Sequence, residues 1–190
     1  MMFPKKSVLL TTSREPSDRI RTFCNDITHS IPNVIRVNRG KLNLEGVAEK
    51  ALELNAVRVV VIDRWKHGFA SIRFFQTESA SGLTPLPPLI NIANVRLRRE
   101  FETKTKPIKS LAITMSSENS SVVRRLGQSL SGFFDIPVFV GRDIVSNFSA
   151  VMHVSTSASK EFQITFVLLP TLVEIGPRID VSKVVWDERK

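Results

Sequence analysis

Residues 7–39, SVLLTTSREPSDRIRTFCNDITHSIPNVIRVNR, align without a gap with residues 110–142, SLAITMSSENSSVVRRLGQSLSGFFDIPVFVGR. Eight of the 33 aligned positions are identical. The apolar residues of the two stretches also recur together at helical spacing. They are Ile20, Phe23, Ile27 and Ile31 in the first stretch, and Val123, Leu126, Leu130 and Phe134 in the second. This shared period predicts a duplicated unit, because each copy must bury the same helix face against its sheet.

The first copy predicts the element order β-α-β-α-β-β. Its apolar runs predict strands at 8–11, 34–37, 57–62 and 69–75, and its helical patterns predict helices at 17–31 and 44–54. The second copy predicts strands at 111–114, 138–140, 151–154 and 162–168, a helix at 120–134 and a shortened helical turn at 144–148. We therefore expect an α/β fold made of two tandem related halves.

The predicted halves span about 5–80 and 108–185, with a connector at 81–107. The Ser/Gly/Pro-rich stretch QTESASGLTPLPP, residues 76–88, is typical of a connector. A further strand is expected at 90–97, and the corresponding tail of the second half is TLVEIGPRIDV, residues 171–181.

Charge is the strongest bulk signal. The chain carries 27 Lys and Arg against 18 Asp and Glu, for a net charge of +9 and a pI near 10.2. Such an excess favours a polyanion as partner, with nucleic acid first, although a merely solvated basic surface would give the same total. No apolar run is long enough to span a membrane. The single cysteine, Cys24, lies on the apolar helix stripe, which predicts a buried thiol and a reducing, cytoplasmic location.

Catalytic and metal-binding motifs are absent from the sequence. The three histidines have no ligand spacing, and neither a Walker loop nor a G-x-S-x-G turn occurs. We expect no metal, no cofactor and no enzymatic activity. An enzyme whose site assembles only in space stays open as an alternative.

Three segments are candidates for RNA contact. The Ser/Thr-rich loop after the first strand carries Arg14 and Arg21 beside a predicted helix N-terminus, which attracts anions; helix capping and a solvated face are the alternative. The turn NRGK carries Arg39 and Lys41, and Arg142 is the counterpart of Arg39 in the second copy; an ordinary solvent turn is the alternative.

The third candidate is a hairpin tip formed by Arg64, Trp65 and Lys66. Its cations flank an aromatic ring that could stack on a base. The alternative is a tryptophan that folds back onto its own hairpin.

These motifs resemble the Brix domain family of ribosome-biogenesis proteins. The resemblance rests on TSREPS and RTFCNDI within 12–27, PNVIRVNRGK at 32–41 and LVEIGPR at 172–178. It identifies residues 1–190 as a single Brix domain similar to the compact archaeal form and to the small-subunit processing branch. It implies that each half resembles the anticodon-binding domain of class IIa aminoacyl-tRNA synthetases, with the halves packed around a pseudo-two-fold axis.

The resemblance also implies binding to pre-rRNA or rRNA without catalysis, often with other assembly proteins. We therefore expect a monomeric, non-enzymatic RNA-binding factor that assists rRNA processing and ribosome assembly. Arg178, in the EIGPR motif, is a further candidate RNA contact, and its alternative role is an ion pair that joins the halves. The alternative function is a protein-interaction scaffold with only incidental RNA contact.

Overall fold

The computed structural model describes residues 7–78, 82–103, 105–115, 120–140, 147–156 and 162–187. Its helices are α1 (Asp18–Ser30), α2 (Leu44–Glu53), α3 (Ser121–Phe134) and the short 3-10 helix η1 (Arg98–Glu100). Within these ranges no helix has both the length and the apolar content needed to cross a bilayer. The strands are β1 (Ser7–Thr12), β2 (Val34–Arg36), β3 (Ala56–Arg64), β4 (Ala70–Glu78), β5 (Gly82–Arg96), β6 (Leu111–Met115), β7 (Val138–Val140), β8 (Ala150–Thr156), β9 (Phe162–Leu168), β10 (Val173–Glu174) and β11 (Arg178–Val185).

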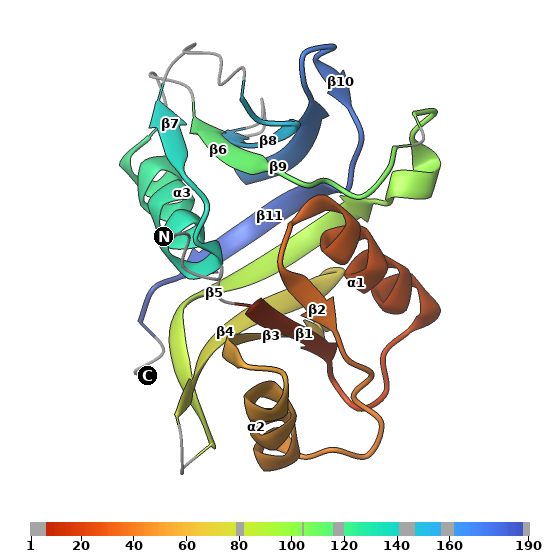
Figure 1. Ribbon diagram of the computed structural model, residues 1–190, viewed down its shortest axis with the longest axis vertical. Coiled ribbons are helices and arrows are strands. Elements are labelled where there is room, and N and C mark those ends of the chain that lie inside the picture. Colours follow the sequence, from red (N-terminus) through yellow and green to blue (C-terminus); the bar gives the residue numbers. More distant parts are fainter. Residues whose placement is uncertain are drawn as a thin grey trace.

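All strands belong to one mixed sheet in the order β2-β1-β3-β4-β5-β11-β9-β8-β6-β7, with β10 paired to β9 (Figure 1). β1 runs parallel to β2 and β3, and β6 runs parallel to β7 and β8. At the centre β5 pairs antiparallel with β11, from Arg96 opposite Arg178 to Leu89 opposite Val185. Read outward from this central pair, the two sides of the sheet have the same succession of parallel and antiparallel neighbours.

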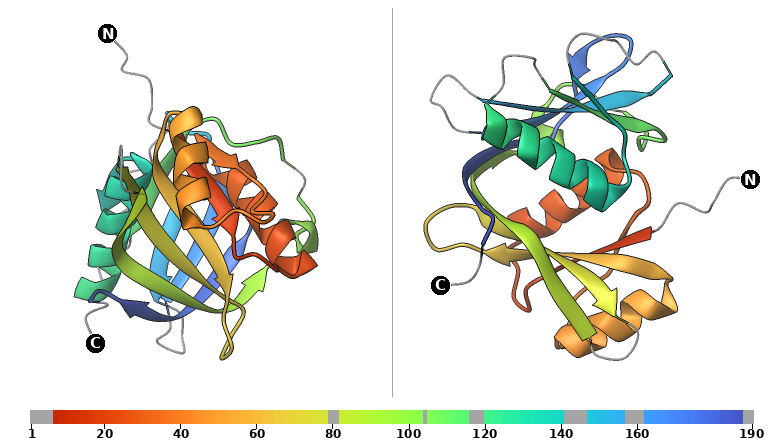
Figure 2. Two further views of the ribbon diagram at one scale, coloured as in Figure 1. Left: turned by 90° about the horizontal axis from the view of Figure 1, so that it is seen from below. Right: turned by 90° about the vertical axis from the view of Figure 1, so that its left-hand side faces the viewer.

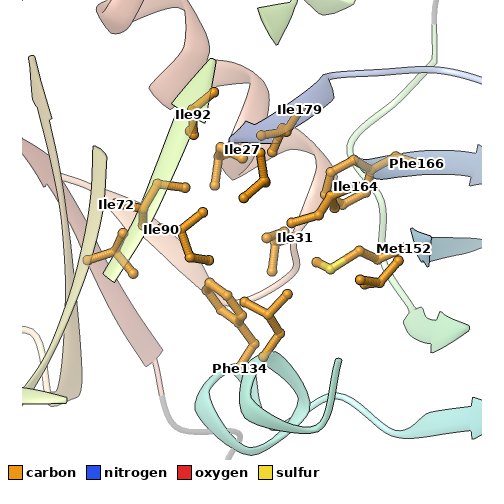
Figure 3. Packing of buried hydrophobic residues seen from close by; sticks show 14 of the residues in the cluster. Ile27, Ile31, Ile72, Ile90, Ile92, Phe134, Met152, Ile164, Phe166 and Ile179 are labelled. Carbon is orange, nitrogen blue, oxygen red and sulfur yellow. The ribbon is translucent and has the colours of Figure 1, made fainter. Parts of the chain in front are cut away.

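The sheet curves around α1 and α3, which lie inside it, whereas α2 packs on the outer face (Figure 2). One apolar core joins α1, α3 and strands from both sides of the sheet. Figure 3 shows Ile27 and Ile31 facing Phe134, Met152 and Phe166 across this core. An apolar cavity of about 40 Å³ remains between them. A smaller cluster under α2 includes Val47, Ala51 and Phe75.

Both long helices begin at a serine that the two aligned stretches share. Ser17 Oγ accepts a hydrogen bond from the Ile20 amide at 3.3 Å, and Ser120 Oγ accepts one from the Val123 amide at 3.4 Å. Each serine satisfies an amide that the first helical turn leaves without a partner. The predicted helices at 17–31 and 120–134 are confirmed to within one residue at each end.

The Ser/Gly/Pro-rich stretch at 76–88 forms strand rather than an irregular linker in its described part. Residues 76–78 end β4, and residues 82–88 begin β5, which runs on into the strand expected at 90–97. Prolines mislead here because β11 pairs with β5 only from Leu89 onward, so Pro85, Pro87 and Pro88 lie where β4 alone flanks the strand. Proline is tolerated at such an edge because its missing N–H leaves no partner unbonded. Of the helical turn expected at 144–148, residues 144–146 lie outside the described residues.

The thiol of Cys24 should be inert in the native protein. It is fully buried on α1, and burial, the largest effect, raises its pKa to about 12. We expect no reaction with a disulfide reagent near pH 8 and one equivalent of reaction after unfolding. An unfolded thiol ionises at about pH 8.5. Above that pH ionisation favours the unfolded chain, so the stabilisation by the buried neutral thiol is complete below it and is lost as the pH rises toward 12. Rapid labelling of the native chain would contradict this assignment.

Candidate nucleic-acid interface

The carboxyl ends of β1 and β2 lie side by side and lead into two loops. β1 ends at Thr12, and its loop runs to the start of α1; β2 ends at Arg36, and its loop runs to the start of α2. Two hydrogen bonds fix the loop after β2 to β1. The Val37 amide donates to the Leu10 carbonyl, and Thr11 Oγ1 donates to the Val37 carbonyl, each at 2.9 Å. In sheets with parallel strands, ligands bind at such carboxyl ends.

A cleft of about 510 Å³ opens between these loops. Four arginines line it, one each from the loop after β1, from α1, from the end of β2 and from the loop after β2, together with smaller residues such as Thr12, Asn38 and Gly40. The arginines are Arg14, Arg21, Arg36 and Arg39. No aspartate or glutamate is among the described residues that line the cleft. We call this feature the arginine cleft.

Three of the four arginines are at least partly exposed to solvent. Arg14 is exposed. Arg21 is about half exposed and forms an ion pair with Asp18, with 2.7 Å between Nη1 and Oδ1. Arg36 is partly buried and donates to the side-chain oxygens of Asn25 and Asn38. The structure thus brings Arg14 and Arg21 together, as the sequence predicted, and adds Arg36.

Arg39 does not fit the alternative of an ordinary solvent turn, because the residue is only 8% exposed. The turn is closed by a hydrogen bond from the Leu42 amide to the Arg39 carbonyl at 3.0 Å, with Gly40 at φ +51°. Arg39 Nε donates a hydrogen bond to the Leu42 carbonyl at 2.6 Å, so the guanidinium is held against the backbone of its own turn. Desolvation lowers the pKa of Arg39, and the neighbouring charge of Arg14 adds to this effect, while Asp63 opposes it.

The other two members of that predicted group have different outcomes. Lys41 is exposed and follows Gly40 on the same turn, next to the arginine cleft. Arg142 lies outside the described residues, so its expected equivalence to Arg39 as an RNA contact stays a prediction.

The hairpin tip connects β3 to β4 and follows the carboxyl end of β3. Because β3 runs parallel to β1, this end lies on the same edge of the sheet as the arginine cleft. Arg64 and Lys66 are exposed. Trp65 is half-buried, and its ring covers Gly68 so closely that an added Cβ would clash with it. The tryptophan therefore folds back onto its own hairpin, which leaves Arg64 and Lys66 as the accessible members of this candidate.

Arg178 lies at the central β5–β11 pairing rather than in the arginine cleft. Its guanidinium binds both carboxylate oxygens of Glu174, with 2.8 Å between Nε and Oε1, and lies over the Phe101 ring at 5.9 Å. The hydrogen bonds to Glu174 raise the pKa of Arg178. Arg178 does form an ion pair, but its partner Glu174 is only four residues away and lies in the same predicted half.

We expect Arg178 to act in stability rather than in RNA contact, because Glu174 occupies its donors. Replacing it with glutamine should reduce the free energy of unfolding by about 1 kcal/mol, because both partners of this ion pair keep some contact with solvent. RNA affinity, measured by filter binding, should stay within about twofold, a difference of roughly 0.4 kcal/mol. A tenfold loss of affinity with unchanged stability would return Arg178 to the RNA-binding residues.

Sequence reasoning missed Arg36. It lies on a three-residue strand in which Ile35, its neighbour, is the more exposed residue, so alternation gave no sign of a functional face. The sequence did hold one sign of its role, because Arg36 lies only three residues before the candidate Arg39.

Several known proteins resemble this chain. No family model matches it. A protein of Sulfurisphaera tokodaii, named "Probable Brix domain-containing ribosomal biogenesis protein", is 33% identical over 79 residues, which cover 42% of this chain and 45% of the relative. One of the same name from Pyrobaculum aerophilum is 26% identical over 141 residues, covering 73% and 74%. The U3 small nucleolar ribonucleoprotein protein imp4 of Schizosaccharomyces pombe is 38% identical over 55 residues, covering 29% and 19%.

Solved structures share the fold. The crystal structure of a probable ribosomal biogenesis protein from Aeropyrum pernix superposes with a TM-score of 0.75 at 21% identity, covering 95% of this chain and 99% of that one. An archaeal Imp4-like protein superposes with a TM-score of 0.60 at 20% identity, covering 94% and 99%.

The chain therefore has the large mixed α/β fold of these two archaeal structures. The chain is a homologue of the archaeal Brix domain-containing ribosomal biogenesis proteins. Its matches span less than half the length of the Sulfurisphaera protein and of a second relative from Aeropyrum pernix.

Proposed function

We propose that this chain is a non-enzymatic RNA-binding factor in ribosome biogenesis. It binds pre-rRNA or rRNA and assists processing and assembly of the small subunit, acting as a monomer in the cytoplasm. The observation that carries the proposal is the arginine cleft, which gathers four guanidinium groups without a carboxylate among its described lining residues. The net charge of +9 and the names of the archaeal relatives support it.

The lack of catalysis is supported by the state of the acidic groups near the interface. Asp18 pairs with Arg21, and Asp63 pairs with Arg73 at 2.5 Å. Both carboxylates already have an arginine as their partner, so neither is free to act on a ligand in the cleft. The cleft is therefore suited to holding an anion rather than to acid or base catalysis.

We also propose that the sheet consists of two duplicated halves related by a pseudo-two-fold axis between β5 and β11. The order of strands supports this, because β2-β1-β3-β4-β5 on one side is matched by β7-β6-β8-β9-β11 on the other. The halves are residues 5–80 and 108–185, joined by 81–107, and the match of β5 with β11 favours extending the first half to Arg96. A resemblance of each half to an anticodon-binding domain belongs to the same proposal.

RNA recognition can be tested with the wild-type chain in a filter-binding titration. Fragments of ribosomal RNA and an unrelated RNA of the same length should be compared at several salt concentrations. We expect tighter binding to some ribosomal fragments and an affinity that falls as salt rises, because phosphate contacts release counterions. Equal binding to all RNAs and to a synthetic polyanion would contradict the proposal.

A second candidate function is a protein-binding scaffold, favoured by the hairpin between β9 and β10. Leu172 there is 64% exposed with φ +55°, and Val173 beside it is also exposed. An exposed leucine in the left-handed region is unfavourable on both counts, which is more easily explained by a protein partner than by RNA. The same titration separates the two functions, because a scaffold lacks selectivity among RNAs.

A further inference from the structure

The guanidinium of Arg39 is a buried cation that the protein itself does not fully satisfy. Its Nε is bonded to the Leu42 carbonyl, but its Nη1 is buried without a hydrogen-bond partner among the described residues. Leaving a buried donor unpaired is costly, and more so when the group is charged. Arg39 also lines the arginine cleft, so an anion bound there would lie next to this side chain.

Two nearby acids, Asp63 and Asp18, do not meet this need. Asp63 raises the pKa of Arg39 but is bonded to Arg73 Nε at 2.5 Å, and Asp18 is paired with Arg21. Arg14 places a like charge near Arg39. The described lining of the cleft thus holds four cationic side chains and no carboxylate, which favours binding of an anion.

Two further features favour a phosphate. Ser13 Oγ, between the cleft residues Thr12 and Arg14, is a second buried polar atom without a partner among the described residues. Pro16, which also lines the cleft, directly precedes Ser17, the N-cap of the 13-residue helix α1. Helix N-termini favour phosphate because their free amides and dipole attract negative charge.

We propose that the arginine cleft is a built pocket for one phosphate group of RNA, with Arg39 as its fixed floor, rather than part of a diffuse basic track. This rests on the proposed RNA binding. The phosphate is either a backbone phosphodiester or a terminal phosphomonoester. Arg39 suits this role because one edge of its fork is held by the Leu42 carbonyl while Nη1 is left for the ligand. A lysine has the charge but not the two-sided fork.

Substitution with charge retained separates a pocket from a track. We expect Arg39→Lys to weaken binding of a short single-stranded RNA by about tenfold or more, the size of one hydrogen bond to a charged group. Arg64→Lys, at the exposed hairpin tip, is the matched control and should change affinity by less than about twofold. Equal affinities of both variants and the wild type would overturn the pocket while leaving RNA binding intact.

The source of the phosphate follows from a second comparison. If the pocket takes a terminal phosphate, the wild type binds RNA with a 5′-phosphate more tightly than the same RNA with a 5′-hydroxyl, and Arg39→Lys removes the difference. If the pocket takes a backbone phosphate, Arg39→Lys weakens the binding of both RNAs by the same factor. Arg14→Gln, an exposed substitution that leaves the turn intact, should weaken RNA binding as well.

A readout without RNA keeps the pocket testable if RNA binding itself fails. Inorganic phosphate should raise the thermal unfolding temperature of the wild type above that in chloride of equal ionic strength, because a ligand that binds only the folded state stabilises it. The increase should be lost in Arg39→Lys and kept in Arg64→Lys. The same temperature in phosphate and chloride, with no specific effect of Arg39→Lys on RNA, would overturn the proposal.

Discussion

Replacing Gly176 with alanine is expected to lower the free energy of unfolding by about 3 kcal/mol, combining the cost of a left-handed residue with that of overpacking. Gly176 has φ +67°, where a side chain is strained. An added Cβ would lie 2.5 Å from a carbon of the Phe101 ring and 3.3 Å from the Arg98 Cα. The closer contact is with the Phe101 ring, which lies beneath the guanidinium groups of Arg96 and Arg178, so the ring or the turn must shift.

A shift of this turn would break contacts between distant parts of the chain. The Gly176 carbonyl accepts hydrogen bonds from Ser30 Oγ at 3.1 Å and from Arg98 Nη1 at 3.5 Å. Arg98 also donates its backbone amide to the buried carboxylate of Asp26 at 2.9 Å. The turn thus joins the end of α1, the segment around η1 and the start of β11.

Denaturant unfolding measures this effect, and Gly132→Ala is the matched control. Gly132 is an exposed residue inside α3, and an added Cβ there meets nothing within 4 Å. That substitution should stabilise the protein by about 0.5–1 kcal/mol, because alanine favours a helix. A decrease below about 1 kcal/mol for Gly176→Ala would show that the turn is less tightly packed than described.

The second large effect is expected on RNA affinity. The double substitution of Arg14 and Arg21 by glutamate should weaken binding at low salt by about a hundredfold, since each reversal both removes a phosphate contact and repels the strand. The slope of log K against log salt should also become shallower, by about 0.7 for each phosphate of a single-stranded RNA that the variant no longer neutralises. Both residues are exposed, so the free energy of unfolding should change by less than about 1 kcal/mol.

The matched control is the double substitution of Arg124 and Arg125 by glutamate. These are exposed residues of α3, and Arg124 is the counterpart of Arg21 in the aligned stretches. Both double variants remove the same total charge, so a general decrease in positive charge would affect them equally. The same decrease in affinity for both would show that the arginine cleft has no special role.

Local features of this fold could be predicted where a few neighbouring residues decide the structure. Ser17 and Pro16 mark the start of α1, and the spacing of Ile20, Phe23 and Ile27 gives its buried face. β5 could not be predicted in full, because its prolines are tolerated only where β11 is absent, which is a property of the whole sheet.

The candidate site was predictable in part for the same reason. Arg14 and Arg21 follow a Ser/Thr-rich loop beside a helix N-terminus, which is a local signal. The burial of Arg39 depends on the fold of its turn, and the role of Gly176 depends on Phe101, 75 residues earlier in the chain. The specific motif EIGPR thus lies in a packed turn of the fold, away from the arginine cleft.

Crosslinking of the wild-type chain to a ribosomal RNA fragment by ultraviolet light, followed by mapping of the attached peptides, tests the central proposal most directly. We predict crosslinks in residues 12–21 and 36–41, with the hairpin tip at 64–66 as the next site. Addition of inorganic phosphate should reduce the first two sets more than the third. Crosslinks confined to α3 or to the exposed hairpin at Leu172 would contradict RNA binding at the arginine cleft.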